Sequence, residues 1–265
     1  MPVELRGGTQ TNWRVWGEGA PDTLLLHCSL GHSGAWKAVT GELDRTCVAF
    51  DLPGHGRSGP LQEGVDFQQQ CLDVAETFLG DTPMDVVGHS FGATVALRLA
   101  MEHPESVRRL VLIEPVLLCA AKSSAEFDSY FAEFAPFMDA VNDGDMMRAA
   151  ELFASFWSEG LSWDKMSGEQ QKGMASLIHV IPREDPAILE DNAGVLRDGW
   201  LERTTLPVLL IEGTLSPPII AAVQNTLEAR LPNTQRVRIE GAGHMTPLTQ
   251  ADEVARLITA FFDAT

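Results

Sequence analysis

The sequence is poor in basic residues and in long apolar runs. Its 265 residues hold 19 lysines and arginines against 37 acidic residues, a formal net charge of −18. A nucleic acid or an anionic membrane is therefore disfavoured as a partner, because both attract positive charge. No run approaches the roughly 20 apolar residues of a membrane-spanning helix. The N-terminus lacks a basic segment followed by an apolar one, so no signal peptide is expected.

Cysteine is also scarce. The four cysteines are scattered without a C-x-x-C pair, so neither disulfides nor a zinc site are expected, and a cytoplasmic location follows. The composition suits a small, neutral molecule as substrate, and no metal or organic cofactor is expected. A homodimer is left open as the assembly state.

Short apolar runs predict the strands of a mostly parallel sheet. Between them lie helical patterns at residues 67–79, 93–101 and 252–262, which predict helices on both faces of that sheet. The opening NWRVWGEG predicts an antiparallel edge strand. The runs read as strands are TLLLHC, CVAFDL, MDVVGH, RLVLIEP, LPVLLIEG and TQRVRIEG.

One block interrupts this alternation. Residues 117–203 show no convincing strand but many helix formers and aromatic residues, as in EFDSYFAEFAPFMDAV. Long insertions of this kind are often lids over a functional site, although an ordinary helical layer packed on the sheet would give the same pattern. We expect a core domain built from residues 1–116 and 204–265, with a helical cap inserted at 117–203.

Ser90 is the candidate nucleophile. It lies in GHSFG, after the predicted strand MDVV and before the predicted helix ATVALRLAME. A turn this tight requires small neighbours, here Gly88 and Gly92, and the following helix directs its first N–H groups at developing negative charge. The N–H of Phe91 is therefore a candidate oxyanion donor. The alternative is a serine that only caps the helix.

His244 is the candidate base. It lies in GAGHMTPL, between the last predicted strand and the last helix, and it follows the serine in the chain as a hydrolase base does. His179, in the insertion, is expected to reach a ligand.

Four motifs in order resemble those of the α/β-hydrolase fold superfamily, in its single-cap serine hydrolase form. The motifs are LLLHCSLGHSGAW, VAFDLPGHGRSG, VVGHSFGATVALRLAMEHPESVRRLVLIEP and GAGHMTPLTQADEV. The resemblance implies a three-layer α/β/α sandwich around an eight-stranded, mostly parallel sheet. It implies a Ser–His–acid triad and a second oxyanion N–H from Ser29, with Leu30 as the alternative. A serine nucleophile excludes the branches that attack through a carboxylate, the haloalkane dehalogenases and epoxide hydrolases.

The sequence departs from the family pattern at two places. Cys28 stands where glycine is usual, but without a nucleophile turn it is not expected to attack. Ser216 stands where the family commonly has the acid, in LPVLLIEGTLSPPII. Glu114, at the end of RLVLIEP, is our candidate acid, because a charged residue ending a buried strand needs a partner. Glu212 and Glu240 are alternatives that could instead be solvated loop residues, and a triad without an acid stays open.

The aromatic and methionine side chains of the insertion favour an apolar acyl or aromatic substrate group. Leu30, Trp36, Trp157 and His179 are the candidate substrate contacts. The expected reaction is cleavage of a carboxylic ester or related acyl bond through an acyl-enzyme. Alternatives are C–C bond hydrolysis, a lyase step or cofactor-free oxidation on the same fold, and a non-catalytic ligand receptor.

Overall fold

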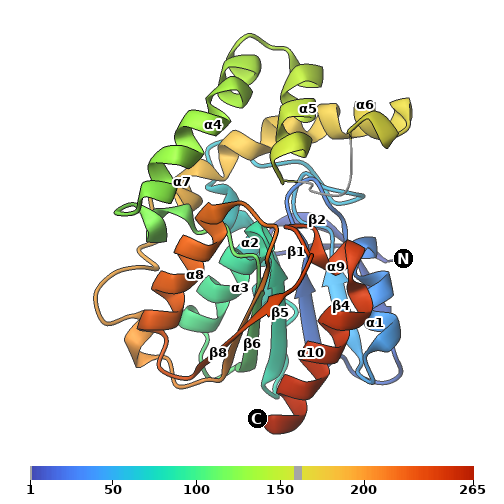
Figure 1. Cartoon of the computed structure of the whole chain (residues 1–265). Coiled ribbons are helices and arrows are strands. Elements are labelled where there is room, and N and C mark those ends of the chain that lie inside the picture. The colour runs from blue at the N-terminus through green and yellow to red at the C-terminus, as the bar shows by residue number, and fades with distance from the viewer. Residues whose placement is uncertain (1, 158–162) are drawn as a thin grey trace.

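The computed structural model describes residues 2–157 and 163–265, which form an eight-stranded sheet with helices on both faces (Figure 1). The strand order is β1-β2-β4-β3-β5-β6-β7-β8, and β2 runs antiparallel to both of its neighbours while the other pairs are parallel. The strands are β1 (Val3–Arg6), β2 (Thr9–Trp16), β3 (Thr23–Leu26), β4 (Cys47–Phe50), β5 (Met84–His89), β6 (Val107–Ile113), β7 (Val208–Gly213) and β8 (Thr234–Ile239).

The predicted fold class is confirmed. Each predicted apolar run forms a strand, and their alternating side chains divide between two cores on opposite faces of the sheet. Leu24 and Leu26 of β3 contribute to one core, and Leu25 contributes to the other. The opening strand β2 is not the edge strand, because β1 pairs on its outer side.

Helices cover both faces of the sheet. One core is packed against α2, α3 and α8, and the other against α1 and α10. The helix predicted at 67–79 ends at Glu76, and α8 was not predicted. The helices of this part are α1 (Lys37–Glu42), α2 (Phe67–Glu76), α3 (Phe91–Glu102), α8 (Pro218–Arg230), α9 (Thr246–Thr249) and α10 (Ala251–Ala264). None of the described helices is long and apolar enough to span a membrane.

The insertion between β6 and β7 lies above the carboxyl ends of the strands (Figure 1). Its described residues form helices and 3-10 turns and no strand. Residues 158–162, inside the predicted cap, lie outside the described residues. The helices are α4 (Ala125–Asn142), α5 (Met146–Trp157), α6 (Gly168–Leu177) and α7 (Asp185–Ile188).

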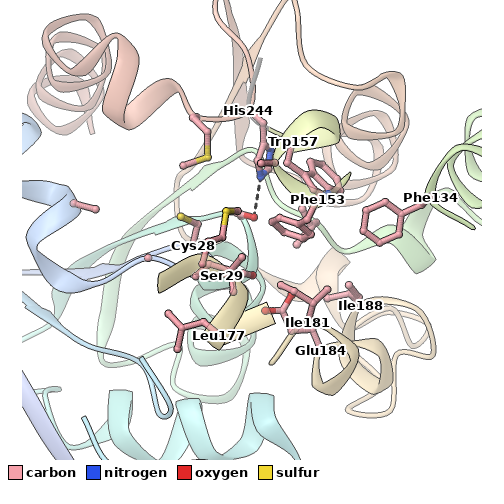
Figure 2. Close-up of a pocket in the computed structure, with 18 of the residues that line it drawn as sticks. Cys28, Ser29, Phe134, Phe153, Trp157, Leu177, Ile181, Glu184, Ile188 and His244 are labelled. Carbon is pink, nitrogen blue, oxygen red and sulfur yellow. Dashed lines mark hydrogen bonds between the residues drawn. The ribbon is translucent and has the colours of Figure 1, made fainter. Parts of the chain in front are cut away.

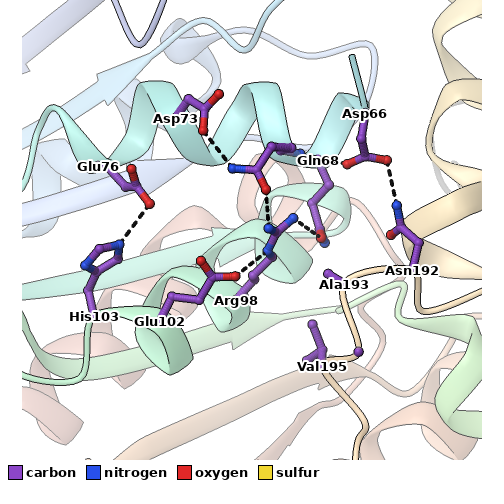
Figure 3. Close-up of polar contacts among 12 residues, drawn as sticks. Asp66, Gln68, Asp73, Glu76, Arg98, Glu102, His103, Asn192, Ala193 and Val195 are labelled. Atoms are coloured by element: carbon purple, nitrogen blue, oxygen red, sulfur yellow. Dashed lines mark hydrogen bonds and ion pairs between the residues drawn. The ribbon is translucent and has the colours of Figure 1, made fainter. Parts of the chain in front are cut away.

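Polar contacts tie the end of the insertion to the core (Figure 3). Asn192 donates a 2.9 Å hydrogen bond to Asp66, the residue that caps α2. Arg98 of α3 donates to Glu102 at 2.7 Å and to Gln68 of α2 at 3.3 Å. The Arg98–Gln68 contact joins α3 to α2, and the Asn192–Asp66 contact joins the returning chain to the start of α2.

A buried ion cluster fixes the opposite end of the nucleophile strand. Asp85 of β5 is fully buried and accepts four hydrogen bonds of 2.6–2.9 Å from Arg108 and Arg109. Arg109 also donates to the backbone carbonyl of Phe262 in α10. The cluster therefore joins β5, β6 and the C-terminal helix.

We expect Asp85→Ala to lower the free energy of unfolding by about 3–5 kcal/mol, because it leaves the buried Arg109 without its counter-ion. Urea denaturation measures this loss. Glu253→Ala is the matched control, since its ion pair with Arg256 is solvent-exposed and should contribute less than about 1 kcal/mol. Equal losses in the two variants would contradict the role given to the buried cluster.

Candidate active site

Ser90 lies at a strained turn between β5 and α3. Its backbone angles are φ 57° and ψ −121°, in a region that side chains other than glycine seldom adopt. A Cβ atom at Gly92 would lie 2.4 Å from the carbonyl oxygen of His27, and one at Gly88 would lie 2.5 Å from the Cα of Ala93. Both glycines are therefore required by the close approach of the backbone to this turn.

His244 connects the serine to an acid. Its Nε2 lies 2.9 Å from Ser90 Oγ, and its Nδ1 lies 3.0 Å from Glu114 Oε2. The loop after β8 carries it, and His89 holds that loop by a 2.8 Å hydrogen bond to the carbonyl of His244. Burial lowers the pKa of His89 to about 3, so this neighbour stays neutral and donates its Nε2–H.

Glu114 is fully buried at the end of β6, with a left-handed φ of 52°. Its Oε1 accepts hydrogen bonds from the N–H of Gly213 at 2.6 Å and from the hydroxyl of Ser216 at 2.7 Å. Its Oε2 is left for His244. Ser216, which occupies the position where the family commonly has an acid, is thus a donor that orients the carboxyl group of Glu114 on the neighbouring strand.

The alternative acids lie in other environments. Glu212 is 1% exposed and pairs with Arg236 and Arg238 of β8, with contacts of 2.9 Å to Arg236. The expectation that it could be a solvated loop residue is therefore wrong, because it ends a buried strand beside two guanidinium groups. Glu240 is exposed to solvent. Only Glu114, of the three, hydrogen-bonds His244 within the described part of the chain.

The loop after β3 carries the two predicted candidates for the second oxyanion donor, the N–H groups of Ser29 and Leu30. The N–H of Leu30 donates to His55 Nε2 at 3.0 Å, which removes the alternative oxyanion donor. The N–H groups of Ser29 and Phe91 have no acceptor among residues 2–157 and 163–265. Ser29 also lines the cavity that contains Ser90 and His244, and Phe91 begins α3, whose N-terminus carries partial positive charge.

Two neutral histidines hold this loop in place. His27 accepts the N–H of Leu52 at 2.9 Å and contacts the carbonyl of Cys28 at 2.7 Å. Burial lowers the pKa of His27 to about 3 and that of His55 to about 4. Burial also raises the pKa of the Cys28 thiol to about 12, which keeps it protonated and unreactive.

A cavity of about 1210 Å³ opens above Ser90 and His244, between the sheet and the insertion. Figure 2 shows Phe134, Phe153 and Trp157 on one side of it, and the ring of Trp157 lies 4.6 Å from that of His244. Leu30 and Trp157, two of the predicted substrate contacts, line the cavity. The lining is mostly apolar.

Two expected substrate contacts lie elsewhere. Trp36 is 1% exposed and packs in the core on the α1 and α10 face of the sheet, because its 3-10 turn directs it away from the cavity. His179 is exposed and contacts the carbonyl of Ser176 in its own turn. Neither residue lines the cavity.

Three acidic residues in the cavity lining were not predicted from the sequence, Asp139, Glu184 and Asp185. Burial raises the pKa of Glu184 to about 8 and that of Asp185 to about 6. Both lie in PREDPAIL, where acids before a proline are typical of an exposed helix start. No local signal in the sequence distinguishes them from a surface pair. The described residues contain no cluster of three or more metal-ligating side chains.

A model of the alpha/beta hydrolase family matches residues 23–257. The chain belongs to this family. Among curated proteins it is 29% identical to a pimeloyl-[acyl-carrier protein] methyl ester esterase of Yersinia pseudotuberculosis, over 95% of this chain and 97% of that protein. It is 28% identical to the same enzyme of Nitrosomonas europaea, over 84% and 88% of the two chains. The predicted class, an ester-hydrolysing enzyme, agrees with these names.

Solved structures share the fold of this family member. A meta-cleavage product hydrolase superposes with a TM-score of 0.75 at 19% identity, covering 100% of this chain and 98% of the other. The 2-hydroxy-6-oxo-6-phenylhexa-2,4-dienoate hydrolase of Rhodococcus sp. strain RHA1 superposes with a TM-score of 0.73 at 20% identity, covering 99% and 100%.

The neutral histidines around the site predict acid sensitivity. The pKa values of His27, His55 and His89 lie below the ordinary 6.5, so the unfolded chain binds protons that the folded chain does not between pH 6.5 and about 4. Stability is therefore lost as the pH falls below 6.5. Each such histidine lowers the free energy of unfolding by up to about 1.4 kcal/mol for each pH unit of that fall.

His89→Gln keeps a donor toward the carbonyl of His244 but removes the titration. The fall in unfolding free energy between pH 8 and 4.5 should therefore be smaller in this variant by about 2–3 kcal/mol. Denaturant unfolding across that pH range measures it, with the same change at the exposed His179 as control. If the His89 and His179 substitutions changed the pH dependence of the unfolding free energy equally, the assignment of a buried, neutral His89 would be contradicted.

Proposed function

We propose that this enzyme cleaves a carboxylic ester, or a related acyl bond, of a small and largely apolar substrate through an acyl-enzyme. The main support for the proposal is that Ser90, His244 and Glu114 are connected by hydrogen bonds at the bottom of a mostly apolar cavity. The esterase names of the curated relatives support the same reaction class.

The geometry suits each step of this reaction. Ser90 Oγ attacks the carbonyl carbon while His244 Nε2 takes its proton, and Glu114 stabilises the imidazolium through Nδ1. The N–H groups of Phe91 and Ser29 hold the oxyanion. His244 then returns the proton to the departing alcohol, leaving Ser90 acylated. A water molecule then gives a proton to His244 and attacks the acyl carbon. The bond from that carbon to Ser90 Oγ breaks, His244 gives its proton to Oγ, and the carboxylic acid is released.

The helical insertion serves as the cap that excludes water and supplies the acyl pocket. Tyr130, Phe131 and Phe134 of α4 and Phe153 and Trp157 of α5 line the cavity. Burial of one methylene group in such a wall contributes about 0.8 kcal/mol, which corresponds to about a fourfold gain in binding.

Other activities of the fold fit this cavity less well. The dienoate named for the Rhodococcus enzyme is a carboxylate, whereas the lining here holds the carboxyl groups of Asp139 and Asp185 against a single lysine, Lys37. A non-catalytic receptor would have no need for a strained serine hydrogen-bonded to a histidine.

The four cysteines are free and buried, which supports our proposed location in the cytoplasm.

Ser90→Ala should lower kcat on p-nitrophenyl esters by about 10⁶-fold, since no other residue would form the acyl-enzyme. The wild type should hydrolyse these esters with kcat/KM rising by up to about fourfold per added methylene until the cavity is filled. Stopped-flow and steady-state absorbance at the nitrophenolate band measure both. Full activity of the alanine variant would contradict the mechanism.

Glu114→Gln should lower kcat by about 10⁴-fold, because an amide N–H facing Nδ1 favours the wrong histidine tautomer. Glu212→Gln is the matched control, with the same change on the next strand but no contact with His244. We expect its kcat to stay within a few-fold of wild type once activity is normalised to the folded fraction by circular dichroism. A large loss only in the Glu212 variant would transfer the acid's role to that residue.

A further inference from the structure

One carboxyl group in the apolar cavity has no use in folding or in the proposed reaction. Glu184 lies at the start of α7, lines the cavity and is 3% exposed. Its Oε1 is buried and has no hydrogen-bond partner among residues 2–157 and 163–265. In Figure 2 it lies beside Ile181 and Ile188, on the side of the pocket away from His244.

The neighbours of this carboxyl keep it neutral. Burial is the largest cause that raises its pKa to about 8, and the charge of Asp185 adds to the effect. The hydroxyl of Ser29 lies close enough to lower that pKa in part through hydrogen bonding. The Cys28 thiol and the Tyr130 hydroxyl, whose own pKa values burial raises, carry no charge near it. At neutral pH, Glu184 therefore offers both an O–H donor and a carbonyl acceptor.

A buried polar group without a partner costs stability, and a purely hydrocarbon ligand would leave it unpaired. A ligand oxygen would complete its hydrogen bonding. Sites built to hydrogen-bond one substrate oxygen reject analogues that lack it far more strongly than apolar walls reject a missing methylene. The position of Glu184, in a mostly apolar cavity and beside side chains such as Ile181 and Ile188, is suited to that kind of selection.

We propose that Glu184 and the hydroxyl of Ser29 form a polar subsite that binds a neutral oxygen function, a keto carbonyl or a hydroxyl, on the acyl chain of the ester substrate. This inference rests on the proposed ester hydrolysis and adds the substrate class to it. Because Ser29 also offers its N–H to the oxyanion, occupation of the subsite positions the reacting carbonyl over Ser90. An ammonium group is the less suitable occupant, since binding it requires the carboxyl to lose its proton.

The test compares p-nitrophenyl esters of one chain length that differ only in the acyl chain. One is unsubstituted, and the others carry a keto, hydroxyl or ammonium group at successive carbons. For wild type we expect kcat/KM of the keto or hydroxyl ester to exceed that of the plain ester by at least about tenfold at one position of the oxygen. Glu184→Leu should reduce this ratio to about one, and Glu184→Gln, whose amide still donates and accepts, should retain part of it.

Glu190→Leu is the control for substitution near this helix, because Glu190 is exposed and does not line the cavity. It should keep the wild-type ratio. Hydrolysis of the plain ester with no oxygen preference at any position would overturn the subsite and leave the proposed function intact. Preference for the ammonium ester, lost equally in the Gln and Leu variants, would overturn the neutral occupant. Absence of hydrolysis of every ester would overturn the proposed function itself.

Discussion

The proposed site depends on the hydrogen bond between the carboxyl group of Glu114 and His244. Glu114 follows the last residue of β6, and β6 lies beside the nucleophile strand β5. His89, which precedes Ser90, is in register with Ile113, which precedes Glu114. Ser90 and Glu114 therefore leave adjacent strands at the same edge of the sheet. The next strand, β7, supplies the N–H of Gly213, and Ser216 follows with its hydroxyl. Three consecutive strands thus determine where the acid points.

This arrangement stores backbone strain at two neighbouring positions. Ser90 and Glu114 both have left-handed φ angles, 57° and 52°, and such residues cost about 1–3 kcal/mol each. Hydrogen bonds offset the strain, because the N–H of Ser90 donates to Ile113 at 2.9 Å and that of Glu114 donates to Ile211 at 2.9 Å. The packed sheet therefore holds both side chains directed at His244, and little reorganisation is needed before reaction.

Much of this architecture could be predicted from sequence, because the determining signals are local. Apolar runs between turn residues identified the strands, and GHSFG between a strand and a helix identified the tight turn at Ser90. Membership of the family, and the class of ester-hydrolysing enzyme, are confirmed at that level. Glu114 could be selected because a carboxyl group that ends a buried strand needs a partner.

The features that escaped prediction depend on distant parts of the chain. Trp36 and His179 were chosen by residue type, but only the packing of the loop and cap decides that one enters the opposite core and the other faces solvent. Glu212 looks like a loop residue until β8 brings Arg236 and Arg238 beside it. Glu184 resembles a helix start on the surface, and only the fold buries it in the cavity.

Reaction with a fluorophosphonate tests the central claim most directly, because this probe labels a serine only when a neighbouring base activates it. Intact-mass measurement and peptide mapping of the wild type should show one adduct per chain, on Ser90, and the rate of its formation should fall steeply in Glu114→Gln. A wild type that stays unlabelled, an adduct at another residue, or a Glu114 variant that reacts as fast as wild type would contradict the account.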